Sequence, residues 1–211
     1  MRARIVATGA ALAVLAGSAA GCGGDSSAGA CTEVEKPVAN QRASPAPKKP
    51  LDPRKTYDLT FKTNCGSFTV TLDVKSATET SASLVSLTRH RYFDHTIFHR
   101  IVPDFVIQGG DPTQTGSGGP GYQTFDKPPP GTKYTHGVVA MAKLPTEPAG
   151  TSGSQFFVVT RDDAGLPPDY AVVGEVTDGL DVVDRIGKLG DVNTEQPTQT
   201  VEVEKVTVSV T

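Results

Sequence analysis

The sequence is short of several features, and each shortage narrows what the protein can be. Its 211 residues contain no tryptophan, three cysteines and four histidines, and the formal net charge is only −3. A chain with a net charge this close to zero lacks the excess of basic residues that is typical of nucleic-acid-binding proteins, so no nucleic-acid partner is expected. No CxxC pair and no Cys/His spacing typical of zinc is present, so no metal site is expected. No internal repeat is visible.

What is present is a globular composition with many chain breakers. Hydrophobic residues make up 37% and charged residues 20% of the chain, which is typical of a folded protein. The 22 glycines and 16 prolines argue against a helical bundle. A coiled coil, a collagen-like fibre and a polytopic membrane protein are excluded as well. A chain of this length holds one domain with a sizeable core, but not comfortably two.

Residues 1–21 have the pattern of a lipoprotein signal peptide. Arg2 and Arg4 precede an Ala/Gly/Val/Leu run over Ile5–Ala20, and Gly21 and Cys22 follow. Small residues before a cysteine suit cleavage and the thiol suits lipid attachment, so the segment resembles a bacterial lipobox. A plain secretory signal is an alternative, and so is a retained anchor, although the run is less apolar than the ~20 residues that a spanning helix needs. We therefore expect an extracytoplasmic protein that is lipid-anchored to the cell membrane.

Residues 22–54 are expected to form a flexible, lipid-anchored arm. The stretch Lys36–Pro53 is rich in proline and lysine, cannot build a core, and is expected to run extended over the surface. With Cys22 taken by lipid, Cys31 and Cys65 can form only one intramolecular bridge. In an oxidising compartment we expect this disulfide, which would pin the arm to the domain, and two unpaired thiols are the alternative.

The remaining residues, 55–211, have a mainly β pattern. Alternating apolar residues on both sides of a turn predict a hairpin over Tyr57–Leu72, and the last run, Thr200–Thr211, alternates with one break in phase. Short helices are predicted over Thr80–His90 and Gly179–Gly187. Further strands are predicted over Thr96–Val102, Phe105–Gln108, Gly137–Lys143, Gln155–Thr160 and Tyr170–Val176. About eight strands and two short helices predict a closed eight-stranded antiparallel β-barrel.

The most informative stretch is FHRIVPDFVIQGGD, residues 98–111. Arg100 and Gln108 are polar residues within strand-like apolar runs, and a core-facing arginine must be paired or must face a cleft. A structural salt bridge is the alternative at this point. A second stretch, TSGSQFFVVT, again places a glutamine, Gln155, beside aromatic residues. Together with GSGGPGY, GVVAMAK and YAVVGEV, these segments resemble the cyclophilin family of peptidyl-prolyl cis-trans isomerases, in order over Tyr57–Thr211.

The resemblance implies an isomerase site and assigns its residues. Arg100 matches the catalytic arginine, and Phe105 and Gln108 complete the catalytic set. Substrate-binding residues implied in the same way are Val106, Gly116, Ala142, Gln155, Phe157, Leu166 and Tyr170. Gly165 stands where many members have tryptophan and Tyr170 where many have histidine. These departures leave the isomerase core intact and change the rim of the site.

The chemistry explains why these residue types suffice. Rotation of an X-Pro bond crosses a barrier near 20 kcal/mol, but it breaks no bond and transfers no proton, so no cofactor is expected. An arginine can donate a hydrogen bond to the prolyl nitrogen, which gains a lone pair only in the twisted amide. A ~10⁵-fold acceleration needs roughly 7 kcal/mol, whereas one hydrogen bond to a charged group supplies about 1.5–3 kcal/mol. The apolar proline pocket must therefore contribute the rest.

Three other motifs point to other functions, but each gives weaker evidence than the cyclophilin-like segments. Gly116–Gly121 fits the pattern GxGxxG, but the prolines that follow are incompatible with the helix that nucleotide binding requires. His95 and His99 are four residues apart without a third ligand, and Ser152 and Ser154 lack a nucleophile elbow. The expected partners are proline-containing polypeptides, and the chain is expected to be a monomer. The alternative function is a non-catalytic proline-peptide binding module or a holdase chaperone on the same fold.

Overall fold

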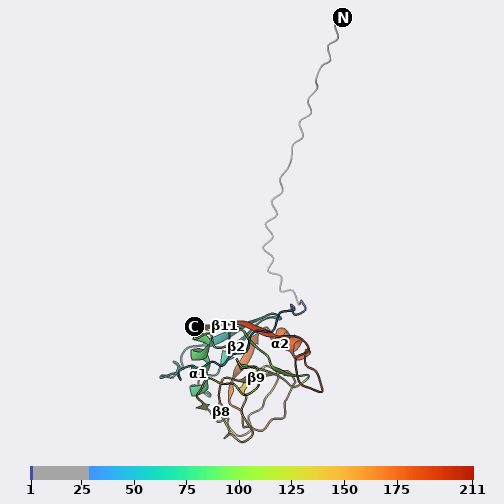
Figure 1. Ribbon diagram of the computed structural model, residues 1–211. Coiled ribbons are helices and arrows are strands. Elements are labelled where there is room, and N and C mark those ends of the chain that lie inside the picture. The colour runs from blue at the N-terminus through green and yellow to red at the C-terminus, as the bar shows by residue number, and fades with distance from the viewer. Residues whose placement is uncertain (2–28) are drawn as a thin grey trace.

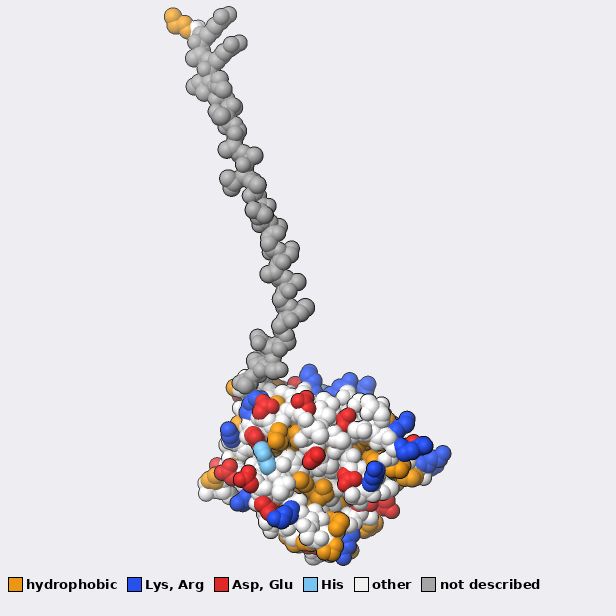
Figure 2. Space-filling model, turned by 180° about the vertical axis from the view of Figure 1, so that it is seen from behind, with side chains coloured by type: hydrophobic (Ala, Val, Ile, Leu, Met, Phe, Trp, Pro, Cys, Tyr) orange, Lys and Arg blue, Asp and Glu red, His pale blue; other side chains and the backbone are white. Residues whose placement is uncertain are grey.

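The computed structural model describes Met1 and residues 29–211. The predicted signal peptide and the predicted lipidation site, Cys22, lie outside the described residues. No helix in the described part of the chain is long and apolar enough to cross a membrane. On the face drawn in Figure 2, acidic and basic side chains are interspersed instead of being gathered by sign.

Antiparallel β-structure dominates the described residues (Figure 1). The elements, in chain order, are β1 (Tyr57–Thr63), β2 (Gly66–Leu72), α1 (Thr78–Arg89), β3 (Thr96–Ile97), β4 (Arg100–Val102), β5 (Val106–Gly109), β6 (Thr124–Phe125), β7 (Val138–Met141), β8 (Thr151–Ser152), β9 (Phe156–Val159), β10 (Val172–Asp178), α2 (Leu180–Gly187) and β11 (Glu202–Val210). Nine strands form one curled sheet in the order β3-β11-β1-β2-β10-β7-β9-β5-β4, and β6 pairs with β8. The sequence did not predict β6 and β8, which are two residues each.

The predicted hairpin is confirmed as β1 and β2. Leu59 lies opposite Val70 and Phe61 opposite Phe68, so the alternating apolar residues face the core together. The rings of Phe61 and Phe68 are stacked with their centroids 4.9 Å apart. The apolar side chains are buried on one face of the sheet and their polar neighbours point to the other face. This alternation is the period-two pattern that predicted the hairpin.

The prediction of a closed eight-stranded barrel is wrong, because the sheet is curled but open. The predicted strand Thr96–Val102 is interrupted, and its two parts, β3 and β4, lie at opposite edges of the sheet. The β4 edge is occupied by a loop, since the Ile101 amide donates to the Glu195 carbonyl over 2.9 Å. The Phe98 amide turns instead to the Val201 carbonyl at 3.0 Å. The segment before β11 therefore fills the gap that direct strand pairing would have closed.

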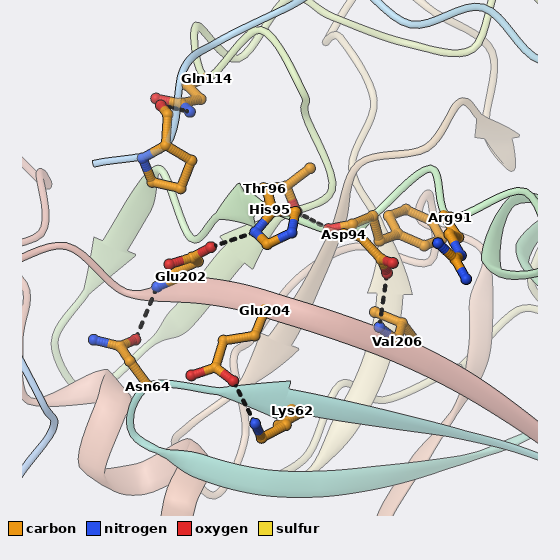
Figure 3. Close-up of polar contacts among 12 residues, drawn as sticks. Lys62, Asn64, Arg91, Asp94, His95, Thr96, Gln114, Glu202, Glu204 and Val206 are labelled. Atoms are coloured by element: carbon orange, nitrogen blue, oxygen red, sulfur yellow. Dashed lines mark hydrogen bonds and ion pairs between the residues drawn. The ribbon is translucent and has the colours of Figure 1, made fainter. Parts of the chain in front are cut away.

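The break in phase in the last strand is a β-bulge. The pairing of β1 with β11 goes from Lys62 opposite Lys205 to Thr63 opposite Val203, which leaves Glu204 as the extra residue. Glu204 forms an ion pair with Lys62 at 2.7 Å (Figure 3). Side chains from neighbouring loops satisfy backbone amides on this strand, as Figure 3 shows for Asn64 with Glu202 and Asp94 with Val206.

The two helices lie on opposite sides of the curled sheet (Figure 1). Helix α1 packs on β11 and β6, and α2 packs on β2, β4 and β5. The residue before α1, Ala77, provides no side-chain cap. The Asp126 carboxylate takes this role from a distant loop, because it accepts hydrogen bonds from the amides of Thr80 at 2.7 Å and Glu79 at 3.4 Å.

Two apolar clusters flank the strands that carry the predicted site. In β5 and β9, Ile107 and Val158 face the main core, whereas Val106 and Phe157 face a second, outer cluster. Because side chains alternate along a strand, one short apolar run supplies both clusters. The outer cluster lies beside the polar residues described below.

Residues 31–54, here called the docked arm, run along the domain without forming a helix or strand. A disulfide joins Cys31 of this segment to Cys65 in the turn between β1 and β2. The extended course agrees with the composition. The sequence predicted a flexible arm, however, and it did not reveal that these residues are bonded to the domain at several points between Thr32 and Ser44.

Candidate active site

The antiparallel register places the predicted polar residues side by side. Arg100 of β4 lies opposite Gln108 of β5, and Gln108 lies opposite Phe157 of β9. The Arg100 Nη1 donates to Gln108 Oε1 over 3.3 Å, and Gln108 Nε2 donates to Gln155 Oε1 over 3.1 Å. Gln155 Nε2 donates in turn to the Gly118 carbonyl at 3.0 Å. A continuous polar row therefore joins the arginine to the loop on the far side of the site.

Arg100 is held from its other side by a residue that the sequence analysis missed. Its Nε donates to Glu195 Oε2 over 2.6 Å, and the two side chains are 34% and 44% exposed. Glu195 is itself fixed, since its amide donates to the Asp191 carbonyl and its carbonyl accepts from Ile101. Within the described residues Arg100 Nη2 has no hydrogen-bond partner, so this donor is available to a ligand. Arg100 is thus both paired and accessible.

Beside the polar row lies the outer apolar cluster, which brings together the other predicted residues. Val106 and Phe157 are buried at its base, and Phe105, Leu166 and Tyr170 are partly exposed at its rim. The rings of Phe157 and Tyr170 meet edge to face with their centroids 5.6 Å apart. An apolar ring that enters from solvent would meet the rim residues and rest on Phe157.

Tyr134 organises this cluster and was also missed. It is fully buried, and its hydroxyl donates to the Tyr170 carbonyl at 2.8 Å and accepts from the Tyr170 amide at 3.0 Å. Its carbonyl accepts from the Ala164 amide at 2.9 Å, so one tyrosine holds the whole segment that carries Leu166. Burial raises the pKa of the Tyr134 hydroxyl, which keeps it neutral and able to donate. Its only signal in the sequence is a lone aromatic residue in a Pro/Gly-rich stretch.

Gln108 and Gln155 also line a cavity of about 710 Å³. Its walls include Ala142, whose amide donates to the Gln155 carbonyl at 2.9 Å, and the segment from Lys143 to Glu147. The opposite wall is the glycine-rich stretch that begins at Gly116. The two glutamines therefore line a cavity that adjoins the apolar cluster at Ala142. Such a site suits an extended peptide with one apolar ring.

The glycine-rich wall belongs to the cleft loop, residues 111–121, which is built around a buried carboxylate. Asp111 is fully buried and accepts hydrogen bonds from the amides of Thr113, Thr115, Gly116 and Gly118, at 2.7 to 3.2 Å. Burial alone would raise the pKa of Asp111, but the hydrogen bonds from Thr113 and from the backbone outweigh it, and the pKa is lowered. The residues of the GxGxxG motif thus form part of the cavity wall, and no helix follows them.

The two histidines weighed as metal ligands lie in different surroundings. His95 is exposed and bonded to Glu202 at 2.7 Å (Figure 3). His99 is buried, and neither of its ring nitrogens has a hydrogen-bond partner within the described residues. Burial lowers the pKa of His99. In the part of the chain that the structure describes, no group of three or more His, Cys, Asp or Glu side chains is placed to hold a metal ion.

Comparison with known proteins gives a consistent result. Residues 58–208 match the family described as cyclophilin type peptidyl-prolyl cis-trans isomerase/CLD. The chain is 35% identical over 150 residues to peptidyl-prolyl cis-trans isomerase CYP18-2 of Arabidopsis thaliana, covering 69% of this chain and 90% of that one. It is 35% identical over 160 residues to peptidyl-prolyl cis-trans isomerase-like 1 of Mus musculus, covering 74% and 95%.

A solved structure is similar as well. The crystal structure of a Cryptosporidium parvum cyclophilin type peptidyl-prolyl cis-trans isomerase in the presence of the dipeptide Ala-Pro has a TM-score of 0.66 to this chain and 28% sequence identity. The match covers 72% of this chain and 98% of that one. The docked arm lies outside the family match, which begins at residue 58.

Proposed function

Because the chain belongs to the cyclophilin-type peptidyl-prolyl cis-trans isomerase family, we propose that the Arg100 site rotates X-Pro bonds in exported proteins and so assists their folding. The observation that carries this proposal is the position of Arg100. A partly exposed guanidinium, bonded at Nε and Nη1, lies at the end of a polar row beside an apolar cluster. The relative studied with Ala-Pro is consistent with a proline-containing peptide as substrate.

In the proposed mechanism the apolar cluster binds the proline ring and Arg100 acts on the twisted amide. Loss of amide resonance makes the prolyl nitrogen pyramidal, and its new lone pair accepts a hydrogen bond from the guanidinium. This interaction is stronger in the transition state than in either planar isomer, so it lowers the barrier. Gln108 orients Arg100 through its 3.3 Å hydrogen bond and presents its amide to the substrate backbone. The guanidinium is already held in place by Glu195 and Gln108, so little reorganisation is required during rotation.

Arginine alone does not account for a large acceleration. A hydrogen bond to a charged group contributes about 1.5–3 kcal/mol, whereas a 10⁵-fold acceleration needs roughly 7 kcal/mol. Phe105, Phe157 and Leu166 fix the ring while the residue before proline rotates, which supplies the remainder through positioning. No proton is transferred in this scheme, so the reaction requires no general acid or base.

The alternative, a binding module or holdase, uses the same surface without catalysis. Binding a proline ring requires the apolar cluster, and Gln108 and Gln155 are sufficient to bond a peptide backbone. A guanidinium held from two sides by Gln108 and Glu195 adds nothing to such binding that the glutamines do not supply. The arginine therefore favours the enzyme.

A protease-coupled assay on an X-Pro peptide tests the proposal through Arg100→Ala. We expect kcat to fall by about two orders of magnitude, or roughly 3 kcal/mol, with a much smaller change in KM, since the lost bond forms only in the transition state. Arg89→Ala is the matched control, because Arg89 is exposed at the end of α1. Activity of Arg100→Ala within twofold of the unaltered chain would exclude the catalytic role and favour the binding module.

Export and anchoring rest on the sequence pattern of residues 1–22 and on the cysteine usage. The disulfide between Cys31 and Cys65 is typical of oxidising compartments. Metabolic labelling with an alkyne fatty acid, followed by membrane fractionation, tests this part. We expect label and membrane association for the unaltered chain and neither for Cys22→Ala. Equal labelling of the two chains would place the lipid elsewhere or exclude it.

A further inference from the structure

The docked arm is hydrogen-bonded to the cleft loop, which forms one wall of the cavity. On this basis we propose that the docked arm positions the cleft loop and thereby sets the affinity for peptides that extend beyond proline into the cavity. The inference rests on the proposed function, because it concerns the same substrate cleft. It adds residues 37–44, which lie outside the family match, to the determinants of specificity.

Four hydrogen bonds join the docked arm to the cleft loop. Three are donated by the arm, and one is donated by a loop glutamine, Gln114, which is labelled in Figure 3. They run from the Asn40 amide to the Pro112 carbonyl (3.0 Å), the Ser44 amide to the Pro120 carbonyl (3.0 Å), Gln41 Nε2 to the Gly119 carbonyl (3.1 Å) and Gln114 Nε2 to the Pro37 carbonyl (2.9 Å). The arm therefore follows the loop from end to end.

The cleft loop needs such support because of its composition. It contains Gly116, Gly118, Gly119 and Gly121, and glycine loses more backbone freedom on ordering than any other residue. No helix or strand forms within residues 111–121. Its order therefore depends on hydrogen bonds that its side chains and backbone form, both within the loop and to other parts of the chain.

Those hydrogen bonds come from three directions. Inside the loop, Asp111 accepts the amides of Gly116 and Gly118. From the cleft, Gln155 Nε2 donates to the Gly118 carbonyl at 3.0 Å. The next carbonyl along the chain, that of Gly119, accepts from Gln41 of the docked arm. Consecutive carbonyls thus point to the substrate side and to the arm side, so a shift of the arm changes the wall of the cavity.

The docked arm has firm attachments of its own. The Arg42 Nη1 donates to the carbonyls of Tyr92 at 2.6 Å and Asp94 at 2.7 Å. At its start, the disulfide fixes Cys31 to Cys65. Hydrogen bonds from a charged group to carbonyls are stronger than neutral ones. These attachments keep the arm against the loop instead of allowing it to follow the loop's motion.

The test uses the full chain with the double substitution Gln41→Ala/Arg42→Ala. Lys48→Ala/Lys49→Ala is the matched control, since both lysines are exposed residues of the same arm. Two ligands are compared by NMR: a blocked Ala-Pro amide and an eight-residue peptide with proline at its centre. For the double variant we expect the Kd of the longer peptide to rise about fivefold, the change that one lost hydrogen bond produces. The Kd of the short ligand and the bound-state exchange rate should stay within twofold.

Hydrogen exchange of residues 111–121 gives a second readout that does not depend on peptide. We expect the amides of Gly116 and Gly118 to exchange faster in the double variant than in the unaltered chain. In the control variant their exchange rates should be unchanged. A Kd for the longer peptide within twofold of the unaltered chain overturns the proposal, and so does unchanged exchange in the cleft loop. If the unaltered chain itself lacks isomerase activity, the proposed function is wrong, and the Kd and exchange results still decide whether the arm positions the loop.

Discussion

At the scale of single residues, Arg100 depends on Glu195, a partner 95 positions away in the chain. The carboxylate accepts a hydrogen bond from Nε while Nη1 donates to Gln108, so the two contacts together fix the guanidinium. We expect Glu195→Ala to lower kcat about tenfold, equal to about 1.4 kcal/mol, because the guanidinium loses its orientation. KM should change less than threefold. Glu195→Gln, which keeps an acceptor, should recover part of the loss.

Glu175→Ala is the control for this substitution, as Glu175 is exposed on β10. The kinetic constants are measured with the same X-Pro peptide, and the melting temperature is recorded for each variant. A kcat that is unchanged or raised in Glu195→Ala would show that the ion pair does not position the arginine. A lower kcat together with a lower melting temperature in both alanine variants would point to a folding defect instead.

A second residue-scale prediction concerns His99 and pH. Burial lowers the pKa of His99 in the folded protein below its ordinary value of about 6.5. The unfolded chain then binds a proton first as the pH falls, so the stability due to neutral His99 is present above pH 6.5 and lost below it. Urea unfolding at pH 7.5 and 5.5 should show this loss, and His99→Phe should reduce it. An equal pH dependence in both chains would contradict the assignment.

At the scale of elements, the ends of helices and strands are completed by distant side chains. Helix α1 has no local cap, and Asp126 bonds the Thr80 amide at 2.7 Å instead. Asp126→Ala should lower the free energy of unfolding by about 1 kcal/mol, the usual cost of losing a cap. Urea unfolding measures this, with the exposed Asp162→Ala as control. A change below about 0.3 kcal/mol would mean that water replaces the carboxylate without cost.

The open edge of the sheet follows the same rule. The Ile101 amide at the β4 edge donates to the Glu195 carbonyl, so one short loop both covers this open edge and carries the carboxylate that holds Arg100. Fold and site are therefore coupled at this element. A change in the loop's length would act on both.

At the scale of the whole molecule, the disulfide connects the docked arm to the domain. Cys31 and Cys65 are 34 positions apart, and closing a loop of that size stabilises a protein by about 3–4 kcal/mol in the chain-entropy model. Reduction should lower the free energy of unfolding by part of this amount, and with it the urea midpoint, because the arm can leave the domain before the domain unfolds. The turnover of a blocked Ala-Pro peptide should persist, since the predicted site residues lie on the domain. An unchanged midpoint after verified reduction would contradict this.

Much of this protein follows from its sequence alone, for a physical reason. Alternation in Tyr57–Leu72 and the apolar pattern of the two helices are local properties, because side-chain direction repeats with the backbone period. The family segments likewise pointed to Arg100, Gln108 and Gln155 as candidate site residues, because their neighbours along the chain carry the pattern. The break in phase at Glu204 and Lys205 was also visible in the sequence, and the structure shows that it is a bulge.

Other features were decided only in three dimensions. Glu195, Tyr134 and Asp126 act on partners far away in sequence, and no local periodicity encodes such a pairing. The open edge depends on which loop packs against β4, and the course of residues 37–44 depends on carbonyls that the cleft loop presents in the folded structure. Backbone and side-chain hydrogen bonds of this kind are satisfied by whichever donor or acceptor the tertiary structure brings near. The sequence therefore determined most of the elements and pointed to the candidate site residues, and the packing of distant segments decided how they are held.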